Sequence, residues 1–242
     1  MRIIEELILV GAATVRTNCY LQYLVKAKIK PKTILLLSQE GNSPLLQGQL
    51  KQQQIDELNS NHDLSEYFDL NISINELISN FDLNVIYCFA NTINDKKVIK
   101  CIKNINAKYA IFSGAGGDIL RDEVLNLPTK FIHVHPGEIP KYKGSTTIYY
   151  SILNENLCHA SAFFLEKEID SGDLLLVKKF HPPKEKKIID YVFDPHIRGV
   201  VLIELITEYI KKGKFISHNP LQKEEETYFI IHPLLKHIAI LK

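Results

Sequence analysis

The first 135 residues alternate short apolar runs with amphipathic stretches, and this alternation limits the fold more than any other feature. The apolar runs, each the length of one strand, lie at 6–12, 32–38, 85–90, 109–113 and 131–135. The stretches with helical spacing lie between them, at 15–29, 73–80, 94–104 and 117–127. Because repeated strand–helix–strand units connect through right-handed crossovers, this order predicts an α/β fold with a mainly parallel, twisted sheet and flanking helices.

Two parts of the chain depart from this alternation. The polar segment 39–63 is expected to be a long loop with at most one short helix. After a short helix expected at 145–153, two extended runs follow at 160–166 and 174–180. A turn with the sequence Asp170-Ser171-Gly172-Asp173 joins these runs, so we expect them to form antiparallel or edge strands.

The C-terminal part is expected to be a short helical and extended appendage. A Pro-Pro pair closes the main domain, predicted at 1–183, and the appendage covers 184–242. Its charged first residues, 184–187, are typical of a linker. An amphipathic helix is expected at 195–212, ended by Gly213, because glycine is the usual C-cap of a helix.

Composition and charge narrow the function. Hydrophobic residues make up 45% of the chain, enough for a buried core, and the formal net charge of +1 gives no electrostatic footprint for a large nucleic acid. No apolar run approaches the roughly 20 residues that span a bilayer, and the first residues lack a signal-peptide pattern. The four cysteines form no Cys-x-x-Cys pair, so neither a zinc ribbon nor a disulfide framework is expected. We therefore expect a cytoplasmic protein without membrane or nucleic-acid partners.

Two histidines and an aspartate form the strongest candidate site. His133 and His135 end a predicted strand, where side chains two apart face the same way, and Asp170 lies on the later turn. Ligands of open α/β sheets bind beyond the carboxyl ends of the strands. Such a set can bind a divalent metal, or it can serve acid–base and oxyanion-stabilising roles in acyl transfer. It can also be a hydrogen-bonded pair of structural histidines, and spacing alone leaves all three alternatives open.

Three motifs follow one another in this part of the chain. His133-Val-His135 is followed by Gly137-Glu-Ile-Pro-Lys-Tyr-Lys-Gly144, then by Ser145-Thr-Thr-Ile-Tyr-Tyr150, and later by Ile169-Asp-Ser-Gly-Asp173. In order and spacing the chain resembles the folate-dependent formyltransferases, which include methionyl-tRNA, glycinamide ribonucleotide and sugar-nucleotide N-formyltransferases, and it is most similar to the sugar enzymes. The resemblance covers about residues 1–180, with specific motifs only in 113–180.

The resemblance implies a Rossmann-like formyltransferase fold, formyl-tetrahydrofolate as formyl donor, and His133, His135 and Asp170 as catalytic residues. The Asn of the family falls on His133, and an imidazole replaces that donor only as the right tautomer or as imidazolium. His135 is expected to donate an N–H to the formyl oxygen, and His133 is a second candidate donor. Asp170 is expected to orient an imidazole, raise its pKa and take the amine proton. The remaining histidines are expected to be structural, with His159 the one closest to the site.

A Gly-rich turn after a predicted strand is the candidate cofactor loop. It lacks the Gly-x-Gly-x-x-Gly spacing of dinucleotide sites, but its glycines let a ligand approach the backbone, and the resemblance places it in the pterin pocket. A tight connection without a ligand is the alternative. The residues assigned to the cofactor are Ser113, Gly114, Gly116, Gly117, Asp118 and Glu166. Those assigned to the acceptor are Lys141, Tyr142 and Lys143, whose cations suit a phosphate unless they only form a solvated loop.

The acceptor is inferred by elimination. Within the resembled family the tRNA enzymes carry a large C-terminal barrel, whereas about 60 residues follow residue 183 here, and the net charge is only +1. The amino-terminal phosphate loop of the purine branch is not apparent. A nucleotide-linked amino sugar is therefore the expected acceptor, with a homodimer as the expected assembly. The alternatives are a metal-dependent amide or formyl hydrolase using His133, His135 and Asp170, and an inactive relative that binds folate or a sugar.

Overall fold

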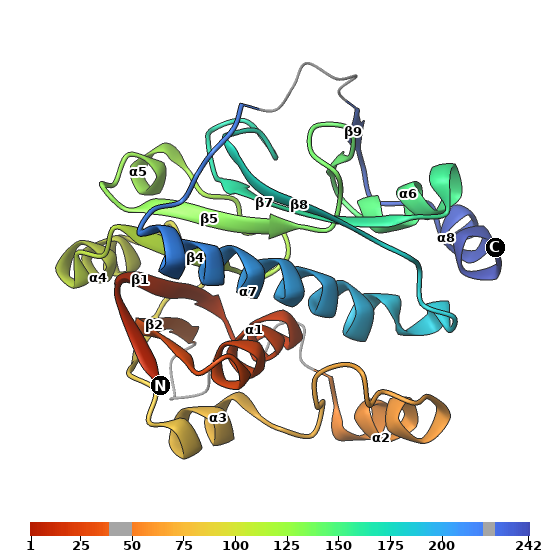
Figure 1. Ribbon diagram of the computed structural model, residues 1–242, viewed down its shortest axis with the longest axis horizontal. Helices are drawn as coiled ribbons and strands as arrows, with labels where there is room; N and C mark the ends of the chain where they lie inside the picture. The colour runs from red at the N-terminus through yellow and green to blue at the C-terminus, as the bar shows by residue number, and fades with distance from the viewer. Residues whose placement is uncertain (39–49, 220–225) are drawn as a thin grey trace. The chain divides into compact units, whose positions relative to one another are not determined.

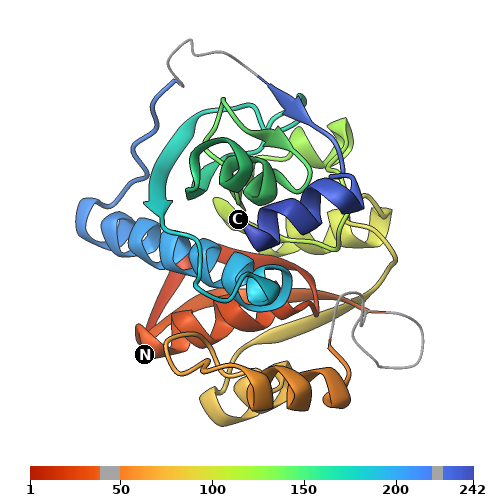
Figure 2. The same cartoon turned by 90° about the vertical axis from the view of Figure 1, so that its right-hand side faces the viewer.

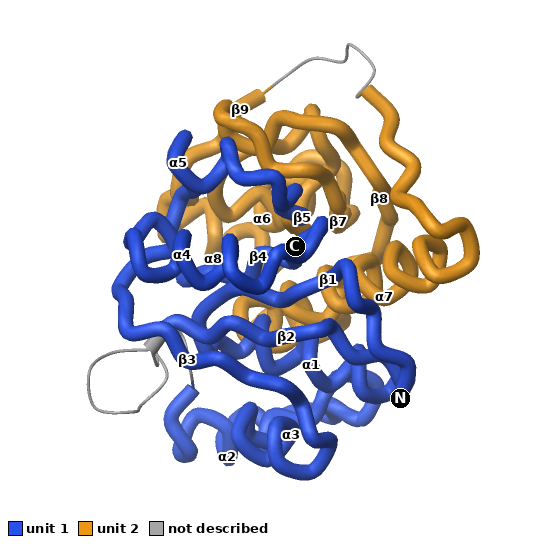
Figure 3. Tube along the Cα trace, turned by 90° about the vertical axis from the view of Figure 1, so that its left-hand side faces the viewer, with its two compact units in different colours: residues 1–132 blue, residues 133–242 orange. Residues whose placement is uncertain are grey.

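The chain folds into two compact units, 1–132 and 133–242, which Figure 3 colours separately. The computed structural model describes residues 1–38, 50–219 and 226–242. Strand β5, Lys130–His135, crosses the boundary, so its first residues belong to unit 1 and its last residues to unit 2. The predicted domain boundary after residue 183 does not coincide with the division between these two units, and it stays a prediction.

The strands hydrogen-bond in the order β3-β2-β1-β4-β5-β7-β8 (Figure 1). The pairs β1–β2, β2–β3, β1–β4 and β4–β5 are parallel, whereas β7 and β8 are antiparallel. The prediction of a mainly parallel sheet with an antiparallel pair after residue 145 is therefore confirmed. The strands are β1 Arg2–Ala12, β2 Ile29–Ser38, β3 Val85–Phe89, β4 Tyr109–Ser113, β5 Lys130–His135, β7 Cys158–Phe164 and β8 Leu174–Phe180.

The helices up to α7 follow the predicted order, whereas α8 was not predicted as a helix. They are α1 Val15–Lys26, α2 Gln52–Asn61, α3 Ile74–Phe81, α4 Lys96–Ile105, α5 Asp122–Leu125, α6 Thr147–Glu155, α7 Asp194–Lys212 and α8 Pro233–Leu241. Local signals explain two of their ends. Ser73 and Glu76 form the capping box at the start of α3, and Gly213 ends α7 in the left-handed conformation, with φ 71°.

In unit 1, α1 packs against β2 and α3, and α4 packs against β3. Every residue of β4 is buried, and Leu7, Ile8, Leu9 and Val10 of β1 are at most 1% exposed. Such continuous apolar strands are typical of a parallel sheet covered on both faces. Gly11 of β1 lies opposite Ser113 of β4, which brings the start of α1 and the end of β4 to the same edge.

Unit 2 is built on the antiparallel pair β7 and β8. The long helix α7 runs alongside both strands (Figure 1). All seven residues of β7 are buried. Helix α8 packs against α6 (Figure 2), and a two-stranded sheet joins β6, Lys143–Gly144, to β9, Thr227–Tyr228. The C-terminal part of the chain contains the helix predicted at 195–212, which is α7.

Two local expectations need correction. The helix expected at 117–127 is only α5, because the Asp118 carboxylate accepts hydrogen bonds from Thr92 and from the backbone of Ile93 instead of starting a helix. The segment 184–187 is not only a linker, since a 3-10 turn, Lys186–Ile188, leads into a π-helical turn. Of the polar segment 39–63, helix α2 is the expected short helix, and residues 39–49 lie outside the described residues.

In the described ranges, we find no helix whose length and hydrophobicity would let it cross a bilayer.

The close approach of β1 and β4 gives a stability prediction. A Cβ at Gly11 would lie 2.1 Å from the carbonyl oxygen of Ser113, a backbone atom that a side-chain rotation cannot move. We expect Gly11→Ala to lower the free energy of unfolding by about 1–3 kcal/mol, measured by urea denaturation. Gly116→Ala is the matched control, because a Cβ there meets no atom within 4 Å. Equal stability of the two variants would contradict the packing described for this edge.

Candidate active site

The end of β5 is held in place from two sides within unit 2. Arg198 of α7 pairs with Asp194 one turn earlier, and its Nη1 donates a hydrogen bond to the carbonyl of Val134 at 3.2 Å. On the other side, the hydroxyl of Ser161 donates to the carbonyl of Gly137 at 2.6 Å and accepts from the amide of Ile139 at 3.1 Å. The residue between Val134 and this loop is His135, so its backbone is fixed on both flanks.

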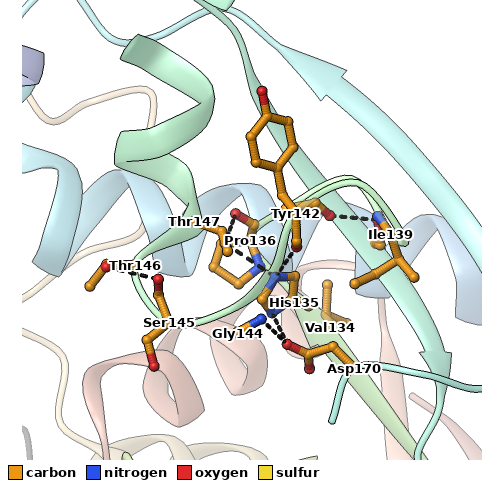
Figure 4. A network of polar contacts seen from close by, with 12 residues as sticks. Val134, His135, Pro136, Ile139, Tyr142, Gly144, Ser145, Thr146, Thr147 and Asp170 are labelled. Atoms are coloured by element: carbon orange, nitrogen blue, oxygen red, sulfur yellow. Dashed lines mark hydrogen bonds and ion pairs between the residues drawn. The ribbon is translucent and has the colours of Figure 1, made fainter. Parts of the chain in front are cut away.

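His135 is 3% exposed, and the Nε2 atom of its side chain faces a backbone carbonyl. The distance from Nε2 to the carbonyl oxygen of Tyr142 is 2.9 Å, and Thr147 Oγ1 lies 3.1 Å from the same nitrogen (Figure 4). The Thr147 hydroxyl donates to the carbonyl of Pro136 at 2.9 Å. A carbonyl oxygen only accepts, so Nε2 carries the hydrogen of the neutral ring.

The other ring nitrogen of His135 faces Asp170. Nδ1 lies 3.4 Å from Asp170 Oδ2, and the same oxygen accepts a hydrogen bond from the backbone amide of Gly144 at 2.7 Å (Figure 4). Asp170 itself has a left-handed backbone, with φ 47°. Gly172 in the same turn has φ 116°, and a Cβ there would meet the carbonyl of Phe164 at 2.2 Å. The turn therefore places Asp170, whose backbone conformation is strained, next to the imidazole of His135.

This arrangement leaves room for one proton between Nδ1 and Oδ2. With Nε2 protonated and the carboxylate ionised, two acceptor atoms face each other, so a proton that arrives there binds both. Burial lowers the pKa of His135, and the Asp170 carboxylate opposes this by favouring the imidazolium. The geometry is that of a general base that takes up one proton without exposing a charge to water.

The structure changes the role predicted for His135. An N–H donor to a formyl oxygen was expected, but the Nε2 hydrogen points at Tyr142 and the Nδ1 side at Asp170. His133, two residues earlier on the strand, is half-buried, and its ring meets Phe163 edge-on with centroids 5.9 Å apart. Of the two predicted oxyanion donors, the geometry leaves His133 as the better candidate, and its role stays a prediction.

The residues assigned to the acceptor differ in exposure. Lys141 is the exposed one, with 44% of its side chain accessible, and it pairs with Glu155. Tyr142 is completely buried, its hydroxyl donates to Glu155 at 3.0 Å, and Lys143 is 8% exposed. Burial of Tyr142 and Lys143 makes them part of the loop's own packing, so of the three only Lys141 presents its side chain to a ligand.

The cofactor residues predicted in the Gly-rich turn belong to unit 1. The Ser113 hydroxyl lies 2.8 Å from that of Thr17, and Arg16 donates to the carbonyl of Gly114. Gly116 and Gly117 are exposed. Their backbone is thus accessible, which suits a planar ligand approaching the main chain, whereas the carboxylate of Asp118 is used by the neighbouring turn. The remaining cofactor candidate, Glu166 of unit 2, is exposed beside the Asp170 turn.

The metal alternative finds no support in the predicted residues. Among the residues that the structure describes, the group whose ligand atoms lie within 4.8 Å of one another is Glu138, Glu155 and His159. His133, His135 and Asp170 are not among the groups of described residues whose ligand atoms lie this close together.

Several residues that shape the site escaped the sequence reasoning. They act through backbone atoms or through positions distant in the chain: the carbonyl of Tyr142, the amide of Gly144, the hydroxyl of Thr147, and the side chains of Arg16 and Arg198. Tyr142, Gly144 and Thr147 lie in the motifs quoted from the sequence, although these contacts were not predicted, whereas Arg16 and Arg198 carried no such signal.

Comparison with known proteins places this geometry in context. The sequence profile of the family described as "Formyl transferase" matches residues 24–187. A methionyl-tRNA formyltransferase from Finegoldia magna is 28% identical over 141 residues, which cover 57% of this chain and 44% of that protein. The chain therefore spans less than half the length of this relative.

Solved structures share the fold. A sugar N-formyltransferase from Shewanella sp FDAARGOS_354 superposes with a TM-score of 0.59 at 13% identity, covering 98% of this chain and 87% of that one. HypX from Aquifex aeolicus in complex with tetrahydrofolic acid superposes with a TM-score of 0.56 at 16% identity, covering 97% of this chain and 30% of that one.

The proton-sharing pair gives a prediction that needs no substrate. In Asp170→Asn the carboxylate that favours the imidazolium is gone, so we expect the pKa of His135 to fall. The measurement is an NMR titration of the His135 ring. Asp173→Asn is the control in the same turn, because Asp173 bonds to Ser217 and not to the imidazole. An unchanged titration in Asp170→Asn would show that the two groups do not interact.

Proposed function

Because the chain belongs to the formyl transferase family, we propose that it transfers a formyl group from formyl-tetrahydrofolate to the primary amine of a small acceptor. The observation that carries the proposal is the buried His135–Asp170 pair with room for one proton. An amine that attacks a formyl carbon must lose a proton as the new N–C bond forms. The pair of neutral imidazole and carboxylate offers a preorganised acceptor that becomes neutral overall once it holds that proton.

In this proposal, separate residues of unit 2 accept the proton, stabilise the formyl oxygen and hold Asp170 in position. The proton of the attacking amine passes to the Nδ1–Oδ2 pair, and the Gly144 amide keeps Asp170 in place throughout. His133 donates an N–H to the formyl oxygen, where negative charge develops. The formyl C–N bond of the donor breaks as the amide forms, and the proton held by the pair returns to the departing nitrogen. The net result is one formyl group exchanged for one hydrogen.

Formyl-tetrahydrofolate supplies the activated one-carbon unit when bound. The residues of unit 1 suit its flat ring system, because Gly116 and Gly117 are exposed and offer backbone groups for hydrogen bonding. Arg16, through Ser113 Oγ at 3.3 Å and the carbonyl of Gly114, would keep this turn rigid. The tetrahydrofolic acid complex of HypX, a protein with the same fold, supports the choice of donor.

For the acceptor we propose a nucleotide-linked amino sugar. The near-neutral charge supports a small molecule over tRNA, because RNA binding rests on an excess of cations. In structural superposition this chain covers 87% of the sugar N-formyltransferase and 74% of the methionyl-tRNA formyltransferase from Clostridium thermocellum, so the difference in coverage favours the sugar enzyme only modestly. The exposed Lys141 is the candidate contact for a phosphate of the nucleotide. A homodimer stays a prediction.

The activity test uses formyl-tetrahydrofolate labelled with ¹³C in the formyl group. Candidate amines are nucleotide-linked amino sugars, glycinamide ribonucleotide and methionyl-tRNA, with mass spectrometry of the product. We expect a formylated amino sugar. Label found only in free formate would indicate a hydrolase, label in methionyl-tRNA would overturn the acceptor, and binding of both substrates without product would indicate an inactive relative.

The proton-accepting pair predicts the effect of one substitution. Asp170→Asn should lower kcat by about 100-fold or more, because the amine proton loses its acceptor. Asp173→Asn should leave kcat within about twofold, since its carboxylate bonds to Ser217 outside the pair. Circular dichroism checks that both variants fold. Full activity of Asp170→Asn would remove the basis of the mechanism.

The oxyanion role of His133 predicts a different pattern. His133→Ala should lower kcat by about 100-fold or more, because one oxyanion donor is lost. His133→Asn should recover most of the activity, because a carboxamide N–H can replace the imidazole N–H. If Asn behaves like Ala, His133 does not act as a hydrogen-bond donor to the formyl oxygen.

A further inference from the structure

A second histidine of unit 2 is buried without a hydrogen bond. His159 is the second residue of β7 and is 2% exposed. Among the described residues, neither of its ring nitrogens has a hydrogen-bond partner. The ring stacks on Tyr142, with centroids 6.4 Å apart and planes at 19°. A buried polar group without a hydrogen bond costs free energy, so such a group calls for a ligand or a specific role.

Two carboxylates surround this imidazole. Glu138 comes from the loop after β5, with Oε2 at 3.7 Å from His159 Nε2, and Glu155 comes from the last turn of α6. One ligand atom from each of the three residues lies within 4.8 Å of the others. A distance of 3.7 Å is too long for a hydrogen bond, but it suits two ligands of one ion, since bonds of about 2.0–2.2 Å to zinc place neighbouring ligand atoms some 3–4 Å apart.

We propose that Glu138, Glu155 and His159 form a binding site for a divalent cation of the zinc class. One imidazole and two carboxylates are ligands that zinc prefers, and water completes the tetrahedron. The Lys141 ammonium pairs with Glu155 and offsets one negative charge, so the site keeps a net charge of about −1 toward the ion. Burial lowers the pKa of His159, which favours the neutral imidazole that a metal needs.

The cation would join three segments that are far apart in the sequence. The loop after β5, the end of α6 and the start of β7 each supply one ligand. Tyr142 lies between this site and the His135–Asp170 pair, because its hydroxyl donates to Glu155 and its carbonyl accepts from His135. The inference rests on the ligand geometry and does not depend on formyl transfer.

The test is equilibrium dialysis of the full chain against Zn²⁺, with metal content measured by mass spectrometry, and titration with Co²⁺ followed by visible absorption. We expect one Zn²⁺ per chain with micromolar affinity. His159→Gln and Glu155→Gln should each weaken binding by about tenfold or more, because each removes a ligand. His237→Gln, at an exposed histidine of α8, should leave binding unchanged.

Lys141 provides a test with the opposite sign. Lys141→Met removes the ammonium that competes for Glu155, so the affinity for Zn²⁺ should rise. A merely structural role of the cluster would not produce tighter binding. If His159→Gln does not fold by circular dichroism, Glu138→Gln at a partly exposed position replaces it.

Three outcomes would overturn the proposal. The first is no binding at 100-fold excess of Zn²⁺, and the second is equal binding by wild type and His159→Gln. The third is binding lost in Cys101→Ser and kept in His159→Gln. That result would indicate that the ion binds at Cys88 and Cys101 of unit 1, whose sulfur atoms lie 4.0 Å apart.

Discussion

The rest of unit 2 must provide hydrogen bonds for the remaining polar atoms of the close His135–Asp170 pair. Both side chains are largely out of water, and an ionisable pair in such a place persists only if its remaining polar atoms are bonded. Tyr142 and Thr147 satisfy Nε2, and Gly144 satisfies Oδ2. Since two of these partners are backbone groups, the loop after β5 must keep one conformation. Ser161 and Arg198 hold its flanks.

Tyr142 connects two parts of this unit. Its carbonyl accepts from His135, while its hydroxyl donates to Glu155 and its ring stacks on His159. Burial raises the pKa of the Tyr142 hydroxyl to about 12, so it remains a donor under ordinary conditions. A change that moves the Glu138–Glu155–His159 cluster can therefore reach the His135–Asp170 pair through one residue, Tyr142. This link gives a physical route by which a bound cation would alter the proposed chemistry.

Much of the fold could be predicted because its signals are local. The buried runs of β1 and β4, the capping box of Ser73 and Glu76, and Gly213 at the end of α7 each act over a few residues. The helix expected at 117–127 failed for the reverse reason. The carboxylate of Asp118 bonds to Thr92 and Ile93, some 25 residues earlier, and no local pattern reports such a contact.

By itself the sequence determined the mainly parallel α/β sheet, the antiparallel pair after it, the family, and the choice of His133, His135 and Asp170 as candidates. These follow from periodicity and from motifs of fixed spacing, which are readable along the chain. Only the tertiary structure decided what each nitrogen of His135 faces. It also decided that Tyr142 is buried and that His159 meets two carboxylates. Those properties depend on which distant groups share a volume from which water is excluded, and spacing along the chain does not contain that information.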